Sequence, residues 1–368
     1  MIILILFLLL IVIALIIIQI QNIIKFKIYN INGGKKQYTY KLFCKNKYCQ
    51  YLKHKLNNLG WQEAHNNEKY VDFAYKSNHK MLENNRLSYT FRSTKADFKT
   101  TLKNLDILGN KLQLSTIMKN SPYIPKIYTI QNYNWNSDDD IIIIREVDST
   151  RLMGIYVAIN KQSFIELKKM LLLKKKDAIV SKYITNPLLY KGKKFHLRIS
   201  ITVFIDKNGN KKIKYMKNYI LIIIAKKKYI IMNKIDYLDI DISISGTDDK
   251  NEIILWNVNK RNNLSISSVN FFNKCNKSID VAINSIPLDS LSLYPSEQNA
   301  GIYTYGGDIM LDDTGHAYIL ELNRSAGCLL LGWWNIKHNT FNEKFLNYLS
   351  KVYDFLLDEF ILPYFGYR

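Results

Sequence analysis

Apolar and polar positions alternate in recognisable blocks from about residue 105 to the C-terminus. Apolar residues at helical spacing predict helices within 108–120 and 163–176, and a long amphipathic helix at 340–361. Apolar or alternating runs predict strands, which lie within 123–130, 141–145, 177–184 and 193–205. The turn Asp-Lys-Asn-Gly-Asn at 206–210 leads into a further strand at 211–225 as a β-hairpin. Strands and helices mixed with antiparallel hairpins predict an α+β fold.

Two other stretches carry weaker patterns. Residues 226–300 are polar and rich in Asn, Ser and Asp, so we interpret them as an insertion. Residues 25–104 begin as a basic, polar segment and are assigned to a juxtamembrane and N-terminal region. The main domain is then expected at 105–368. No internal repeat is present.

The N-terminus is a long apolar run. Its first eighteen residues are uninterrupted, and the stretch to residue 24 adds only three polar side chains, a length that spans a bilayer as one helix. No basic residue precedes the run and no small-residue cleavage site follows it, which disfavours a cleaved signal peptide. Lysines begin only afterwards, at Lys25 and Lys27. The sequence therefore predicts a single-pass anchor at 1–24 with the C-terminal domain in the cytoplasm.

The charge balance is strongly basic, with 52 Lys plus Arg against 31 Asp plus Glu and a net charge of +21. This excess favours acidic partners. The alternative is coding bias, because the lysines are scattered and Asn, Ile and Tyr are abundant with them. The absence of zinc-finger spacing and arginine-rich tracts disfavours nucleic-acid binding. The four cysteines are too dispersed for a disulfide framework, so a reducing compartment is expected.

Candidate chemistry appears near the C-terminus, in the sequence GGDIMLDDTGHAYILELNRSAGC. A two-residue turn at Thr314–Gly315 would place Asp308 opposite Glu321, with Asn323 on the same strand face. The opposite face would carry the apolar side chains, namely Ile309, Leu311, Tyr318, Leu320 and Leu322. Three clustered oxygen ligands suit a hard cation such as Mg²⁺. The alternative is a hairpin whose polar side chains face water, and spacing alone does not decide between the two.

Two ordered motifs then carry a family resemblance. The stretch SKYITNPLLYKGKKFHLRI at 181–199, followed by GGDIMLD and YILELNRSA, resembles the tubulin–tyrosine ligase family. The segment LGNKLQLSTIMKNSPYIPKIY at 108–128 is similar to that family's lysine-bearing helix and following strand. The likeness covers about 105–335 outside the insertion. It implies an ATP-grasp fold, in which two α+β subdomains grip ATP, here behind an N-terminal transmembrane helix.

The resemblance implies ATP-dependent ligation. ATP phosphorylates a carboxylate to an acylphosphate, and an amine then displaces phosphate to give an amide. By the same resemblance, Asp308, Glu321 and Asn323 would hold Mg²⁺, whereas the substrate would be an acidic protein or peptide such as a tubulin-like tail. Which amino acid or peptide is joined does not follow from the sequence.

Further residues transfer by motif position. Lys182, Tyr183 and Ile184 would line the adenine site, although packing is an alternative role for the last two. Lys194 and Arg198 match the family's paired basic residues and would act on phosphate or the bound carboxylate as catalytic groups, with a solvated surface cation as the alternative. The remaining cofactor-binding positions are more loosely matched and are Lys111 and Arg145.

Several positions depart from the family pattern. Arg145 stands where a lysine is usual, His196 replaces an aspartate, and Leu221 falls where an arginine is expected. The glycine-rich loop is reduced to Gly154, and Ala326 replaces a proline. Two hypotheses follow: an active, membrane-anchored ligase, or a catalytically impaired ATP-grasp module that binds nucleotide or an acidic partner.

Overall fold

The computed structural model describes a mixed α+β protein with two sheets. The described residues are 37–42, 47–64, 70–76, 84–90, 106–135, 141–147, 154–225, 228–229, 253–265, 268–291, 300–323, 334–335, 340–341 and 343–367. Among them, one sheet has eleven strands, a second has four, and two short strands, β16 (Trp334–Asn335) and β17 (Thr340–Phe341), form a third. The expected α+β class is confirmed.

The large sheet is organised around β10 (Lys193–Asp206). One edge of β10 pairs along ten positions with β14 (Ala300–Leu311), while the other pairs first with β12 (Leu221–Ile224) and then with β11 (Lys211–Tyr215). The strand expected over 211–225 is therefore two strands, separated by the 3-10 turn η2 (Lys217–Tyr219). The remaining partners are β9 (Leu189–Tyr190), β13 (Ile253–Leu255) and β15 (Ala317–Asn323).

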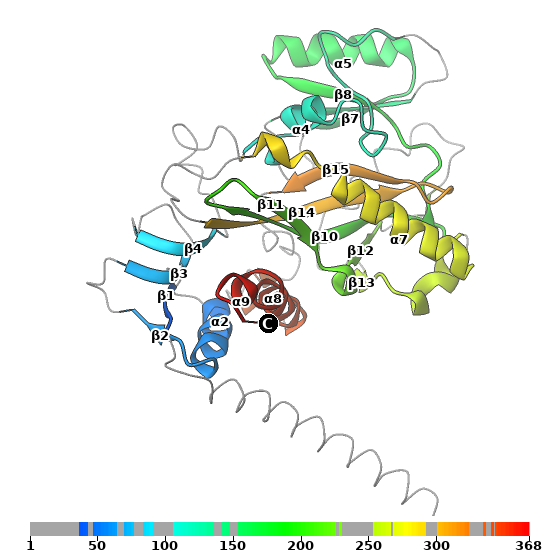
Figure 1. Cartoon of the computed structure of the whole chain (residues 1–368). Helices are drawn as coiled ribbons and strands as arrows, with labels where there is room; N and C mark the ends of the chain where they lie inside the picture. The colour runs from blue at the N-terminus through cyan, green and yellow to red at the C-terminus, as the bar shows by residue number, and fades with distance from the viewer. Residues whose placement is uncertain are drawn as a thin grey trace, which may run out of the picture.

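An N-terminal unit extends this sheet. Its elements are β1 (Thr39–Leu42), α2 (Lys47–Asn58), β2 (Gln62–Glu63), β3 (Tyr70–Lys76) and β4 (Asn84–Thr90). The strands run parallel to one another, and β4 joins β14 in parallel (Figure 1). Sequence patterning did not predict these strands, because charged and polar residues interrupt the apolar positions of β3 and β4.

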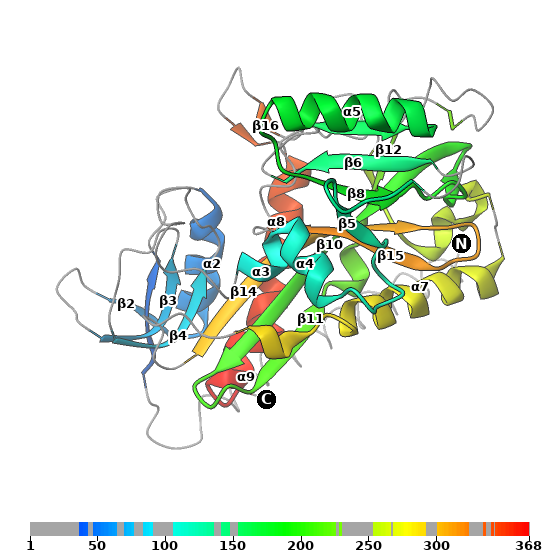
Figure 2. The ribbon, with the colours of Figure 1, turned by 90° about the horizontal axis from the view of Figure 1, so that it is seen from above.

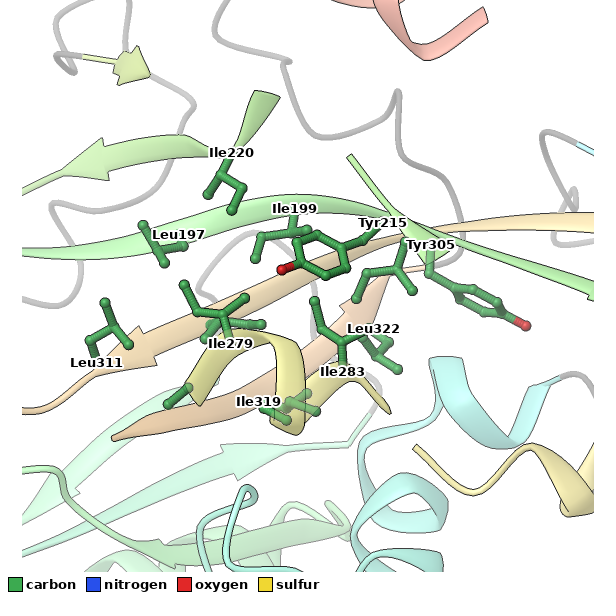
Figure 3. Packing of buried hydrophobic residues seen from close by; sticks show 14 of the residues in the cluster. Leu197, Ile199, Tyr215, Ile220, Ile279, Ile283, Tyr305, Leu311, Ile319 and Leu322 are labelled. Carbon is green, nitrogen blue, oxygen red and sulfur yellow. The ribbon is translucent and has the colours of Figure 1, made fainter. Parts of the chain in front are cut away.

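Helices cover both faces of the large sheet. On one face α7 (Val269–Asn284) packs Ile279 and Ile283 against side chains of β10 and β15 (Figure 3). On the other face lie α2, α8 (Glu343–Leu356), the π-helical turn η6 (Leu357–Ile361) and α9 (Leu362–Tyr364). Because strand side chains alternate, β10 contributes Phe195 to Ile205 at every second position to the α7 core and presents the intervening residues to the other face.

The stretch 226–300, which we interpreted as an insertion, contains helix α7. The helix begins at an N-cap, Ser268, whose side chain accepts from the Phe271 amide. Its residues Phe272, Cys275 and Ile279 are buried in the main core. Nearby are two 3-10 segments, η3 (Val258–Asn263) and η4 (Leu288–Ser290). The polar composition of the stretch as a whole concealed one apolar helix face.

The second sheet forms a separate layer that Figure 2 shows beside β15. Its order is β5 (Ile127–Thr129), β8 (Ala178–Lys182), β6 (Ile142–Glu146), β7 (Ile155–Ala158), and α5 (Lys161–Leu173) covers it. The short helices α3 (Asp106–Gly109) and α4 (Lys111–Ile117) lie between this layer and β15. The helices and strands expected from 105 to 206 are confirmed, within a few residues at their ends.

The expected anchor at 1–24 lies outside the described residues. Within the described ranges, no helix has the length and apolar content needed to cross a bilayer. The α+β part of the fold prediction is therefore confirmed, and the transmembrane part stays a prediction.

Candidate functional site

The β14–β15 hairpin places Asp308 directly opposite Glu321, as the sequence predicted, but by a different route. The turn is one residue longer than expected, since Leu311 pairs with Ala317, whereas a two-residue turn at Thr314–Gly315 would pair it with Tyr318. A β-bulge then shifts the register between Asp308 and Ile309. The two deviations cancel, so the predicted pairing of the two carboxylates is retained.

The bulge changes which β15 side chains are buried. Ile309 pairs with Ile319 and Asp308 with Glu321, which leaves Leu320 as the extra residue. Ile319 and Leu322 lie in the main core, whereas Tyr318 and Leu320 are only partly buried and lie outside it. The expectation that Tyr318 and Leu320 fill the core face is wrong, because one extra residue reverses the alternation within the strand.

Two carboxyl groups and one amide converge at this bulge. Asp308 is buried, and Glu321 accepts a 2.7 Å hydrogen bond from Asn323 Nδ2. Burial, with the neighbouring Glu321 charge adding to it, raises the pKa of Asp308 well above its usual value, against the opposing effect of Arg198. Burial also acts to raise the pKa of Glu321, but Lys111 and hydrogen bonds from Asp308 and Asn323 outweigh it and lower that pKa to about 2. Of the two carboxyl groups, Glu321 is therefore the one that loses its proton more readily.

Cations from three elements surround this pair. Lys111, at the start of α4, places Nζ 3.3 Å from Glu321 Oε2, and Arg198 of β10 places Nε 2.5 Å from Asp308 Oδ1. Arg145 comes from β6 in the small sheet, and its Nη1 donates to the Leu320 carbonyl at 3.3 Å. Burial lowers the pKa of Arg145, with Glu321 opposing it. The predicted residues Lys111, Arg145 and Arg198 thus meet at the bulge.

The N-cap of α4 explains how Lys111 reaches the site. The Asn110 side chain accepts from the amides of Leu112 and Gln113, which fixes the first turn of the helix. Leu114, one turn further along α4, is buried in the main core. Lys111 therefore starts from a fixed backbone position beside β15.

Strand β10 carries a buried polar stripe on the face of Arg198. Lys194, His196, Ser200 and Thr202 are all buried there, at alternate positions. His196 Nε2 lies 3.4 Å from Asp308 Oδ1. Burial, followed by the Arg198 charge, lowers the pKa of His196 to about 3, so this contact joins a neutral imidazole to the carboxyl group and is not an ion pair at neutral pH.

The expected adenine residues lie at the other end of this stripe. Lys194 Nζ donates to the Tyr183 hydroxyl at 2.7 Å and lies 4.2 Å from the centre of the same ring. Lys182, at the end of β8, has an exposed side chain, and Ile184 is partly buried. The structure brings Tyr183 and Lys194 together. It leaves Lys182 at the surface.

The structure shows what surrounds two of the residues that depart from the family pattern, Leu221 and Gly154. Leu221 pairs with Arg198 across β10 and β12 and is buried in the core beneath α8, so it supplies no second cation. Gly154 has positive φ, and an added Cβ would lie 2.7 Å from the Glu146 side chain. Glu146 in turn accepts from the Tyr156 hydroxyl. Gly154 therefore allows the close approach of Glu146.

Sequence reasoning missed two polar groups next to Arg198. These are Ser200, two residues along β10, and Tyr348 of α8; both are buried. Among the described residues, Arg145 Nε and Arg198 Nη1 are buried here without a hydrogen-bond partner, while Ser200 lies within hydrogen-bonding reach of the Tyr348 hydroxyl. Ser200 could have been found from its place in the alternating stripe, whereas Tyr348 carries no local signal.

The donor set fits Mg²⁺ in part. Asp308, Glu321 and Asn323 offer hard oxygen ligands, and Mg²⁺ is commonly held by one or two carboxylates together with substrate phosphates. The described ranges contain no ready-made cluster of three or more His, Cys, Asp or Glu around a metal-sized space. The protein groups would therefore hold the ion jointly with phosphate oxygens.

Comparisons with known proteins agree with this geometry. A model of the tubulin-tyrosine ligase family matches residues 62–236, which include Lys111, Arg145 and Arg198 but not the β14–β15 hairpin. The chain also resembles the crystal structure of the C-terminal domain of K. lactis Pby1, described as an ATP-grasp enzyme interacting with the mRNA decapping enzyme Dcp2. That likeness has a TM-score of 0.54 at 13% identity and covers 90% of this chain and 95% of that one. No curated protein matches the chain. The resemblance that the motifs predicted is thus confirmed over residues 62–236, the part of the chain that matches the tubulin-tyrosine ligase family model.

Proposed function

We propose that this protein is an ATP-dependent ligase that joins a carboxylate to an amine through an acylphosphate. The family match and the ATP-grasp neighbour support an ATP-dependent ligase in general. The observation that carries the finer proposal is the meeting of Lys111, Arg145 and Arg198 around the paired carboxyls Asp308 and Glu321.

Charge at this site suits phosphoryl transfer. Phosphoryl transfer needs positioned cations around the phosphate oxygens and little covalent chemistry from the protein. Lys111, Arg145 and Lys194 would contact phosphates, whereas Lys182, Tyr183 and Ile184 would line the adenine end. Mg²⁺, when bound by Asp308, Glu321 and Asn323, would neutralise phosphate charge. Arg198 would hold the carboxylate substrate beside the γ-phosphate.

The reaction proceeds in two steps. A carboxylate oxygen attacks the γ-phosphorus, ADP leaves, and an acylphosphate remains. The amine nitrogen then attacks the acyl carbon, inorganic phosphate leaves, and the nitrogen loses a proton to give the amide. Neutral His196, close to Asp308, adds no charge to the site during either step.

ADP release tests the proposal. The full-length chain in mild detergent is incubated with ATP, Mg²⁺ and pooled amino acids and acidic peptides, and products are identified by mass spectrometry. We expect ADP together with an amide product that is absent when ATP is omitted. ATP binding without ADP release under any acceptor pool would contradict ligase activity.

A second candidate function has its own support. His196 stands where the family pattern has aspartate, and Leu221, buried in a hydrophobic core, stands where an arginine is expected. These two positions favour a catalytically impaired module that binds nucleotide or an acidic protein. Such a module would bind ATP and an acidic peptide with normal folding but release no ADP.

We further propose that residues 1–24 anchor the chain with its C-terminal domain in the cytoplasm, where its net charge of +21 would attract an acidic protein or peptide substrate. Carbonate extraction of membranes would leave an anchored chain in the pellet. A soluble product beginning after residue 24 would instead show cleavage.

A further inference from the structure

Helix α5 presents apolar side chains on the outside of the molecule. Its Phe164 and Leu171 are buried against the small sheet, whereas Ile165, Leu172 and Leu173 are 48%, 45% and 75% exposed. Figures 1 and 2 show α5 as the outer layer of the small sheet, on the side away from the large sheet. Within the described ranges, α5 carries three of the six large apolar side chains that are this exposed. Such clustering on one helix indicates a contact surface, whereas single exposed apolar residues do not.

Lysines accompany these apolar side chains. The segment 161–176 contains six lysines and one acidic residue, Glu166. Residues three and four positions apart share one side of a helix, so Lys169 lies between Ile165 and Leu172 on the exposed side of α5. Four lysines of the segment have ammonium groups without a hydrogen-bond or ion-pair partner among the described residues, namely Lys161, Lys169, Lys174 and Lys175.

The C-terminal end of α5 has a lysine where the backbone favours glycine. The Lys176 amide donates to the Leu171 carbonyl, and the Lys175 amide donates to the Leu172 carbonyl, both at 3.0 Å. This pair of hydrogen bonds is the Schellman motif, in which the residue after the helix adopts the left-handed conformation. Lys175 does so, with a φ of 51°, although this conformation is unfavourable for a residue with a Cβ. The chain thus places an exposed ammonium group at a position where glycine would fold more easily.

The chemistry of this surface suits an anionic bilayer. A helix that lies flat on a membrane buries aliphatic side chains at the boundary of the acyl chains, while its lysines meet the lipid phosphates. A hydrophilic acidic peptide would pair with the lysines but would leave Leu172 and Leu173 in water. The apolar run at 1–24, which we expect to anchor the chain, would also bring a bilayer within reach.

We propose that the outer face of α5 docks onto an anionic lipid surface. We define this α5 face by its apolar and unpaired basic residues, which are Ile165, Lys169, Leu172, Leu173, Lys174 and Lys175. The docking goes beyond the proposed ligase function and does not rest on it. It would hold the small sheet, which contributes Arg145 to the candidate site, at the membrane surface.

Photolabelling on bilayers of controlled charge tests the docking. The full-length chain is reconstituted in nanodiscs of phosphatidylcholine with or without phosphatidylserine. Both bilayers contain the same trace of phosphatidylcholine with a diazirine near its headgroup, and mass spectrometry identifies the labelled peptides. We expect label in peptides from 161–176 when phosphatidylserine is present. The label should fall about fivefold or more without phosphatidylserine or in about 0.5 M salt.

Matched variants separate the apolar and charged contributions. Leu173→Gln makes an exposed apolar residue of α5 polar, and Val281→Gln does the same on α7. Lys169→Gln removes an exposed charge from α5, and Lys277→Gln removes one from α7. Each α5 variant should lower labelling of 161–176 about fivefold, and each α7 variant should leave it within about twofold.

Lys175→Gly distinguishes docking from a role in folding. Glycine favours the left-handed conformation, so this variant should melt at the same temperature as the unmutated protein or higher. Because the variant loses one ammonium group, its labelling should fall as in Lys169→Gln. Undiminished labelling in Lys175→Gly would remove this lysine from the membrane contact.

The outcomes separate this inference from the ligase and from the anchor. Label in other peptides but none in 161–176 would overturn the docking alone, as would equal labelling with and without phosphatidylserine. Binding of a soluble polyglutamate peptide that is lost in Lys169→Gln, without lipid label on α5, would assign the surface to an acidic protein and also overturn it. ADP release is measured in the same samples and should be unchanged in every variant, so its absence from the unmutated protein would refute only the ligase.

Discussion

Asp308 faces Glu321 because Leu320 is an extra residue in β15. The Leu320 bulge restores the cross-strand pair after a turn that is one residue too long, and its carbonyl accepts from Arg145 of the small sheet. One irregularity thus aligns the candidate metal ligands and links the two sheets. β-Bulges are common beside active sites, where they redirect side chains in this way.

The carboxylate charge at the bulge should control turnover. Glu321→Gln keeps the shape of the side chain but removes the charged member of the pair, so Mg²⁺-dependent ADP release should fall at least about a hundredfold, while the melting temperature shifts little. Glu166→Gln, on the exposed side of α5, is the matched control and should retain activity. Retained turnover in a folded Glu321→Gln protein would remove Glu321 from the site.

Neighbouring leucines of β15 should differ in their effect on stability. Leu322 is 2% exposed in the main core, so Leu322→Gln should lower the free energy of unfolding by about 2–5 kcal/mol through lost packing and a buried amide. Leu320 is partly buried at the bulge, so Leu320→Gln should cost clearly less. Chemical denaturation of both variants measures the difference. Equal losses would mean that the bulge does not place Leu320 outside the core.

Lys194 should contribute to nucleotide affinity. Lys194→Met keeps the apolar stem but removes the ammonium group, and should weaken ATP binding about ten- to a hundredfold, the range expected for a charge-assisted hydrogen bond. Tyr183→Phe keeps the ammonium group and deletes only its 2.7 Å partner, so its effect should be smaller. Titration calorimetry with ATP compares the two. An unaltered ATP affinity in Lys194→Met would show that the ammonium group acts in packing alone.

Burial should protect the Cys275 thiol from ionisation and alkylation. Burial raises the pKa of Cys275 to about 12, so the folded protein holds a neutral thiol at pH 8 that should resist alkylation by iodoacetamide until the chain unfolds. Because the unfolded thiol ionises near pH 9, stability from this group is full below that pH and is lost between about pH 9 and 12. Peptide mass spectrometry follows the labelling. Rapid labelling of Cys275 in the native protein would contradict its burial.

Local patterning was enough to predict the elements in which buried apolar residues recur at a regular helix or strand spacing. Strand β10 was predicted from its alternation, because its core-facing residues, from Phe195 to Ile205, alternate with a stripe of polar residues that is also buried. The hairpin pairing of Asp308 with Glu321 followed from counting residues. Its success depended on the cancelling of a turn error and a bulge, and no local pattern signals a bulge.

Long-range features could not be predicted in the same way. Tyr348 is 148 positions from Ser200, and only the packing of α8 onto β10 brings them together. Arg145 reaches Leu320 between sheets that are distant in sequence. Family resemblance identified Arg145 as a candidate, whereas Ser200 and Tyr348, which match no motif, became visible only through their burial beside Arg198.

Hydroxylamine trapping tests the central claim most directly. Hydroxylamine is a small amine that converts an acylphosphate into a stable hydroxamate whatever the natural amine acceptor is. The full-length chain with ATP, Mg²⁺, pooled carboxylic acids and hydroxylamine should yield hydroxamate and ADP in equal amounts, and Glu321→Gln should yield neither. ATP binding without hydroxamate formation, in a protein that is folded and saturated with nucleotide, would contradict carboxylate activation at the Asp308–Glu321 site.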